Sequence, residues 1–199
     1  MEDTEKQAQR RSVRSIDFFR GFMRSPEQVG SVIPSSRFME RRITNMADLA
    51  RAKCVVELGP GTGGTTRAIL EAMPADGRLV TIELDPQFSA LLEDIGDPRL
   101  ISHIGSAADL GDILDQYGLP GPDAVISGIP FSTMPREIAN TIIEAISTEL
   151  APGGRFLAYQ FRGHVARISE QFLGEPSETE FEFWNIPPMR FYLWRRAAA

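Results

Sequence analysis

Short apolar runs alternate with longer segments of mixed polarity through most of the chain. From residue 53 onward the apolar runs are KCVVELG, RLVTIEL, RLISHIG, PDAVISGIP and RFLAYQF. The segments between them, at about 63–73, 86–94, 107–117 and 135–150, have the length and pattern of helices. Strands that alternate with helices in this way indicate βαβ units and a mostly parallel sheet covered on both faces. The pattern therefore predicts an α/β fold.

Two aromatic, β-rich runs lie near the end of the chain. They flank the pair Pro187 and Pro188 within FEFWNIPPMRFYLWRR. Such runs around a turn signal predict an antiparallel hairpin added to the sheet. The expected sheet therefore has seven strands, mostly parallel, with the antiparallel pair at its C-terminal end.

The N-terminal segment has a two-sided pattern if residues 10–24 are helical. A step of about 100° per residue places one set of apolar side chains on a single arc: Ile16, Phe18, Phe19, Phe22 and Met23. Arg10, Arg14, Arg20 and Arg24 cluster opposite. This pattern is typical of a helix in an anionic membrane interface, although a helix packed on its own sheet is the open alternative. We predict an N-terminal extension, residues 1–40, that contacts a membrane and covers the active site of a main domain, residues 41–199.

Composition narrows the possible environments and partners. The chain has 199 residues, and its net charge of -6 argues against a generic nucleic-acid binder. The single cysteine, Cys54, precedes an apolar run and is expected to be a buried strand residue. No apolar stretch approaches the roughly 20 residues of a membrane span, and the N-terminus lacks the apolar core of a signal peptide. We therefore predict a cytoplasmic monomer without a metal site or nucleic-acid partner, peripheral on the inner face of the membrane.

A glycine-rich turn follows the first predicted strand, in VVELGPGTGGTT at residues 55–66. Glycines between a strand and a helix let the backbone approach a ligand closely, and their spacing here fits two cofactors, a dinucleotide and S-adenosylmethionine. Glu83, at the end of the second strand, would bind ribose hydroxyls in either case. The turn and this acid predict a nucleoside ligand without distinguishing the two.

Glu57 distinguishes between them. A carboxylate two residues before the first glycine would repel the doubly anionic pyrophosphate of a dinucleotide. S-adenosylmethionine instead carries an ammonium and a sulfonium, so an acid beside the turn suits it. We predict this cofactor, with a dinucleotide or a cofactor-free fold as weaker alternatives. Its predicted contacts are Glu57, Gly59, Pro60, Gly61, Thr62, Gly63, Glu83, Leu84, Ser106, Ala107 and Ser127.

The third and fourth strands end in further candidate residues. The third ends in HIGSAADL, where the Ser106 hydroxyl and the Ala107 backbone N–H could meet adenine. In the alternative interpretation Ser106 only caps the next helix. The fourth ends in SGIPF, residues 127–131, at the carboxyl edge of the sheet, where open α/β folds bind ligands.

The combination of ELGPGTG with SGIPF resembles the amino methyltransferases that carry an Asn-Leu-Pro-Tyr-like motif, including the ribosomal RNA adenine dimethylases. The sequence is more similar to the bacterial phospholipid N-methyltransferases, and this likeness extends from IDFFRGFMRSPEQVGSVIPSS to WNIPP. The resemblance implies a class I (Rossmann-like) methyltransferase fold and methylation of phosphatidylethanolamine, and its mono- and dimethyl forms, towards phosphatidylcholine. Ser127 stands where the RNA enzymes usually have Asn or Asp, which makes adenine in RNA the second hypothesis. A catalytically silent S-adenosylmethionine-binding module is the third.

The expected acceptor site surrounds SGIPF. Backbone carbonyls from Ser127 to Ile129 and the Tyr159 hydroxyl are predicted to orient the amine, which must lose a proton before it can attack. His164 is a candidate proton acceptor, although a surface role is more common for such a residue, and His103 is expected to be structural. The predicted substrate-binding residues are Phe19, Arg20, Phe131, Tyr159, Arg162 and Trp184, through cation–π and phosphate contacts, although most aromatic residues should belong to the core.

Overall fold

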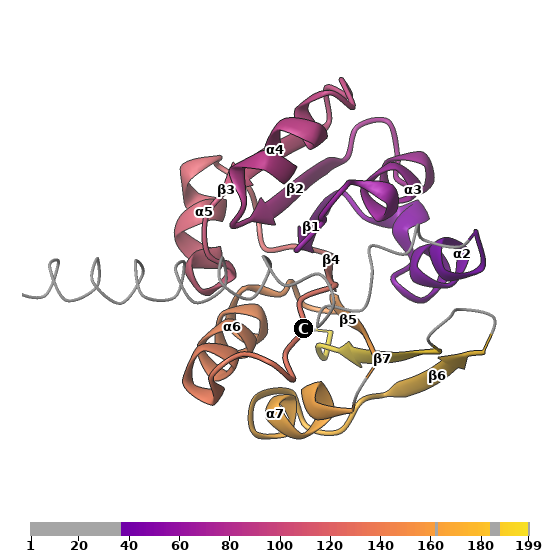
Figure 1. Ribbon diagram of the computed structural model, residues 1–199, viewed down its shortest axis with the longest axis vertical. Helices are drawn as coiled ribbons and strands as arrows, with labels where there is room; N and C mark the ends of the chain where they lie inside the picture. Colours follow the sequence, from indigo (N-terminus) through magenta and orange to yellow (C-terminus); the bar gives the residue numbers. More distant parts are fainter. Residues whose placement is uncertain (1–36, 162, 184–187, 199) are drawn as a thin grey trace, which may run out of the picture.

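The computed structural model describes residues 37–161, 163–183 and 188–198 (Figure 1). The predicted N-terminal amphipathic helix, with Phe19 and Arg20, lies outside these residues. Arg162 and Trp184 lie outside them too. Within the described part of the chain, no helix has the length and apolar character needed to cross a membrane.

The described residues form one seven-stranded sheet with the order β3-β2-β1-β4-β5-β7-β6. The five parallel strands are β1 (Cys54–Leu58), β2 (Arg78–Glu83), β3 (Leu100–Ile104), β4 (Ala124–Ser127) and β5 (Arg155–Gln160). Strand β7 (Met189–Arg195) runs antiparallel between β5 and β6 (Glu178–Glu182). The predicted sheet, including its C-terminal antiparallel hairpin, is confirmed.

The helices lie where the polarity pattern places them, to within a few residues. They are α2 (Arg37–Met46), α3 (Gly64–Ala72), α4 (Pro86–Glu93), α5 (Leu110–Gln116), α6 (Arg136–Glu149) and α7 (His164–Leu173). Two short 3-10 turns, η1 (Leu49–Arg51) and η2 (Ala107–Asp109), precede β1 and α5. The predicted boundary after residue 40 falls inside α2, and Met39 is buried in the core.

Both faces of the sheet are covered, so the central strands are apolar at almost every position. Val55 and Leu157 pack with α2 and α3, whereas Val56 and Phe156 pack with α5, α6 and α7. Figure 1 shows these two groups of helices on opposite sides of the sheet. Cys54 is buried in β1, as predicted, and burial raises the pKa of its thiol to about 11.

The strand order creates a crevice at the carboxyl edge. Strand β1 pairs with β2 on one side and with β4 on the other. The chain therefore reverses its direction of progress through the sheet beside β1, and the loops after β1 and β4 separate at this topological switch point. The glycine turn after β1 and the SGIPF segment after β4 face this crevice.

Candidate active site

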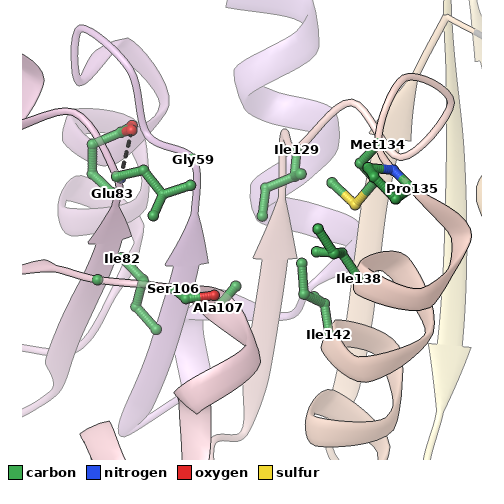
Figure 2. Close-up of a pocket in the computed structure, with 12 residues that line it drawn as sticks. Gly59, Ile82, Glu83, Ser106, Ala107, Ile129, Met134, Pro135, Ile138 and Ile142 are labelled. Atoms are coloured by element: carbon green, nitrogen blue, oxygen red, sulfur yellow. Dashed lines mark hydrogen bonds between the residues drawn. The ribbon is translucent and has the colours of Figure 1, made fainter. Parts of the chain in front are cut away.

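One cavity lies at this switch point, bounded by the ends of the parallel strands and the start of α6 (Figure 2). The predicted residues that line it are Gly59, Glu83, Leu84, Ser106, Ala107 and Ile129. Sequence reasoning missed Ile82, Gly105, Met134, Pro135, Ile138 and Ile142. A signal for part of this wall was present, because Met134, Ile138 and Ile142 recur at four-residue intervals directly after SGIPF.

The glycine turn adopts a backbone that only glycine tolerates well. Gly59, Gly61 and Gly63 have φ angles of 69°, 57° and 81°. A Cβ on Gly59 would approach the Ile129 Cγ1 atom to 3.2 Å, whereas one on Gly61 would meet nothing within 4 Å. The turn is closed by Gly63 N–H, which donates to the Pro60 carbonyl at 3.1 Å. Pro60 and Gly63 are buried and close the turn through this hydrogen bond, whereas Thr62 is exposed.

Glu83 joins this turn to the end of β2. Its carboxylate accepts hydrogen bonds from the backbone N–H groups of Gly61 at 3.3 Å, Leu84 at 2.8 Å and Asp85 at 3.1 Å. Burial raises the pKa of the carboxyl, although these three bonds oppose the shift. The side chain is nearly buried but borders the cavity, where an acceptor of this kind can bind a pair of ribose hydroxyls.

Glu57 lies beneath the glycine turn and does not line the cavity. It is fully buried, and its Oε2 accepts a hydrogen bond from the Thr66 hydroxyl at 2.6 Å. Its Oε1 has no partner among the described residues. The pKa of this carboxyl is raised to about 7, mainly by burial and in part by the charge of Glu83, although the Thr66 hydrogen bond opposes the shift. An incompletely satisfied carboxylate under the turn fits a cationic ligand above it.

The opposite end of the cavity is apolar. Figure 2 shows Ile82 on one side facing Ile138 and Ile142 of α6 on the other. Ser106 and Ala107 border the cavity, and the Ser106 hydroxyl also accepts a hydrogen bond from the Ala108 N–H at 3.2 Å. Ser106 therefore caps η2, and its place beside the cavity leaves the adenine contact a prediction.

The carbonyls after β4 are less available than predicted. Ser127 is fully buried, and its hydroxyl accepts a hydrogen bond from Ile129 N–H at 3.3 Å. The Ile129 carbonyl accepts two hydrogen bonds, from Gln160 Nε2 at 2.6 Å and from Phe131 N–H at 2.9 Å. Because these bonds occupy both lone pairs of the oxygen, an amine could make the predicted contact only by displacing one of them from Ile129. Its side chain lines the cavity instead.

Tyr159 crosses the end of β4 because Gly128 has no side chain. A Cβ on Gly128 would lie 2.5 Å from the Tyr159 hydroxyl oxygen. That hydroxyl is hydrogen-bonded to Thr65 of α3, and burial raises its pKa, so it stays neutral. Phe131 is only 1% exposed and packs in the core, as the alternative interpretation of the aromatic residues expected.

The two histidines have different surroundings. His103 Nδ1 lies 3.1 Å from the Tyr117 hydroxyl, in keeping with a structural role. His164 begins α7, and its buried Nδ1 has no hydrogen-bond partner in the described part of the chain. No group of His, Cys, Asp and Glu side chains among the described residues could hold a metal ion.

Replacing Glu83 tests the ribose assignment. In Glu83→Gln one acceptor oxygen becomes an NH₂ group that faces backbone donors, so we expect the Kd for S-adenosylmethionine to rise about tenfold or more. Isothermal titration calorimetry measures it. Glu71→Gln, on the exposed face of α3, is the matched control and should bind like the wild type. Equal affinity for both variants would contradict the assignment.

The raised pKa of Glu57 makes both stability and cofactor affinity depend on pH. Between its ordinary value of 4.5 and about 7 the folded state binds more protons than the unfolded state, so stability falls as pH rises through this window. The affinity for S-adenosylmethionine should rise over the same range, because the ionised carboxylate attracts its cationic groups. Glu57→Gln should flatten both dependences, as measured by urea unfolding and calorimetry from about pH 5 to about pH 8. Matching pH profiles for the variant and the wild type would refute this role.

No family model matches the chain. The chain is 32% identical over 181 residues to an ornithine lipid N-methyltransferase of Singulisphaera acidiphila, a match that covers 89% of this chain and 94% of that protein. A ribosomal RNA small subunit methyltransferase A of Phenylobacterium zucineum is 32% identical over 94 residues, which cover 46% of this chain and 31% of that protein.

A solved structure adds a likeness of fold alone. The O-methyltransferase TomG of Streptomyces achromogenes, determined in complex with S-adenosylmethionine, superposes with a TM-score of 0.66 at 19% identity. The superposition covers 87% of this chain and 86% of that one. Together with the nearly full-length similarity to the Singulisphaera enzyme, it means that the chain belongs to the family of this lipid N-methyltransferase, within the class I S-adenosylmethionine-dependent methyltransferases.

Proposed function

We propose that the protein methylates the amino group of a lipid headgroup, with phosphatidylethanolamine and its mono- and dimethyl forms as substrates. The observation that carries this proposal is the similarity to a lipid N-methyltransferase over 89% of the chain. Because that relative is named for ornithine lipid, the amine of an ornithine lipid is the second candidate. Both are aliphatic amines on a lipid anchor, so either one requires the site to orient a neutral nitrogen for methyl transfer.

S-adenosylmethionine is the methyl donor, as the sequence predicts. The backbone around Gly59 and Gly61 would hold its methionine end, and Glu83 its ribose. Ser106 and the apolar wall from α6 would hold the adenine. When bound, the cofactor supplies an electrophilic methyl group on a sulfonium. The protein's own work is to present a neutral nitrogen in line with that methyl, at about 3 Å.

The acceptor amine has two groups to bind to at the end of β4. The Gly128 carbonyl accepts no hydrogen bond from the described residues, and the Tyr159 hydroxyl lies directly beside Gly128. Both can accept an N–H from the amine, which directs the remaining lone pair away from them. An ammonium has no lone pair to direct, so the amine attacks only after losing its proton.

An RNA adenine remains the alternative substrate, supported by the partial similarity to ribosomal RNA methyltransferases. The lone pair of an adenine amino group is delocalised into the ring, and the RNA enzymes of the resembling family place an Asn or Asp side chain at this motif. Here Gly128 has no side chain and the Ser127 hydroxyl is turned onto its own loop. The local chemistry therefore favours an aliphatic amine.

Three exposed phenylalanines support approach from a membrane. They are Phe38 (62% exposed), Phe161 (43%) and Phe183 (73%). Phe161 and Phe183 follow the ends of β5 and β6, so they lie at the carboxyl edge of the sheet. Exposed aromatic residues near a lipid-consuming site suit a membrane interface. We propose that this edge contacts an anionic membrane peripherally, on its inner face.

Phe38 belongs to the same edge because of the direction of α2. Arg42, in the middle of α2, forms ion pairs with Glu180 and Glu182 of β6. Asp48, after α2, pairs with Arg155 at the start of β5. The helix therefore runs from the carboxyl edge to the amino edge of the sheet, and Phe38 lies near its start. The N-terminal segment with Phe19 and Arg20 remains a predicted further contact.

The substrate is tested by offering lipids and RNA side by side. The full-length protein is incubated with S-adenosylmethionine and anionic vesicles that contain phosphatidylethanolamine, its methylated forms or ornithine lipid, or with ribosomal RNA. Mass spectrometry should find methylated phosphatidylethanolamine and no methylated adenine. Methylation of ornithine lipid alone would reassign the lipid, and methylation of RNA alone would overturn the proposal.

The variant Gly128→Ala tests whether the Tyr159 hydroxyl takes part in methyl transfer. Its added Cβ would lie 2.5 Å from the Tyr159 hydroxyl oxygen and displace it, so we expect kcat to fall about tenfold or more with little change in cofactor Kd. Gly111→Ala is the control, because there the added Cβ would meet only the flexible Glu149 side chain, at 3.0 Å. Full activity of Gly128→Ala would remove Tyr159 from the acceptor site.

A further inference from the structure

A buried glutamine holds the backbone of the acceptor segment. Gln160 is the last residue of β5 and is only 5% exposed. Its Nε2 donates to the Ile129 carbonyl at 2.6 Å, between residues that are 31 apart in the sequence. A buried amide is costly without a partner, so this bond accounts for a polar side chain in an otherwise apolar layer.

Hydrogen bonds fix nearly every polar backbone group of residues 128 and 129. Gly128 N–H donates to the Leu58 carbonyl at 3.1 Å, and Ile129 N–H donates to the Ser127 hydroxyl at 3.3 Å. The Ile129 carbonyl is occupied by Gln160 and by the Phe131 N–H. Only the Gly128 carbonyl has no partner among the described residues, so one acceptor remains where the unconstrained turn would offer two.

We propose that Gln160 is a positioning residue for methyl transfer, which makes the Gly128 carbonyl the single backbone acceptor for the substrate amine. By occupying the Ile129 oxygen, it prevents the amine from binding one residue further along the chain. It also fixes the peptide plane between Ile129 and Pro130, next to the plane that holds the Gly128 carbonyl and the Ile129 N–H. This inference rests on the proposed function, because it requires an amine substrate.

Because Ile129 also contacts the cofactor cavity, a test of Gln160 must separate a role in fold stability from a role in positioning the lipid amine. The Ile129 side chain lines the cofactor cavity and would touch a Cβ on Gly59 at 3.2 Å. A Gln160 that only stabilised the fold would therefore reduce thermal stability, cofactor affinity and turnover together. A positioning residue affects the lipid step alone, so cofactor Kd and the melting temperature have to be measured beside kcat and KM.

Two variants of similar length test the role of the donor. Gln160→Met has no donor, and we expect kcat/KM for the lipid to fall about tenfold at every pH, with cofactor Kd within about twofold of the wild type. Gln160→Glu can donate to Ile129 only while its carboxyl is protonated, which burial favours. The ratio of its turnover to that of the wild type should therefore fall as pH rises through the pKa of the new carboxyl.

The outcomes distinguish a positioning role of Gln160 from a purely structural one. A lipid-specific loss in Gln160→Met together with a pH-dependent ratio in Gln160→Glu supports the positioning role. Wild-type turnover by Gln160→Met, a ratio that does not vary with pH, or a parallel loss of cofactor affinity and stability would overturn it. If the wild type itself methylates no lipid amine, the proposed function fails first, and the assignment of the Gly128 carbonyl fails with it.

Discussion

The site depends on two carboxylates buried at neighbouring strand ends. Glu83 is stabilised by three backbone N–H groups, whereas Glu57 has one hydroxyl donor and one oxygen without a partner in the described part of the chain. Two like charges in a poorly hydrated region repel each other, which contributes to the raised pKa of Glu57. A cation above the glycine turn relieves this repulsion, and a diphosphate would increase it. We propose that Glu57, although it does not line the cavity, selects a cationic ligand from beneath the turn.

The cofactor and acceptor halves of the site meet at Ile129. Its side chain lines the cavity and packs close to Gly59, while its carbonyl is held by Gln160. Next to it, Gly128 leaves room for Tyr159 to reach Thr65 of α3. Strands β1, β4 and β5 are therefore joined at their carboxyl ends by contacts through two consecutive residues. A shift of this short segment would change the position of both the donor methyl and the acceptor nitrogen.

The elements that sequence analysis predicted are those with a strong local signal. The buried parallel strands appear as continuous apolar runs, and Glu83 could be placed because one acid ends β2 at the expected spacing from the turn. The features that it missed are tertiary contacts. Whether the Ile129 carbonyl is free depends on Gln160, which is 31 residues away, and the α6 wall depends on how that helix packs over β4. No local pattern in the sequence reports either contact.

The same contacts favour one class of amine. An aliphatic amine, once neutral, has a localised lone pair and needs only to be oriented, which one carbonyl and one hydroxyl can do. An aromatic amine also needs polar groups that draw its lone pair out of the ring, yet at this segment the Ser127 hydroxyl and the Ile129 carbonyl are already engaged within the protein. Exposed Phe161 and Phe183 lie at the same carboxyl edge of the sheet as this segment. The backbone hydrogen bonds of this segment and the exposed phenylalanines therefore favour the same substrate, a primary or partly methylated amine carried on a lipid.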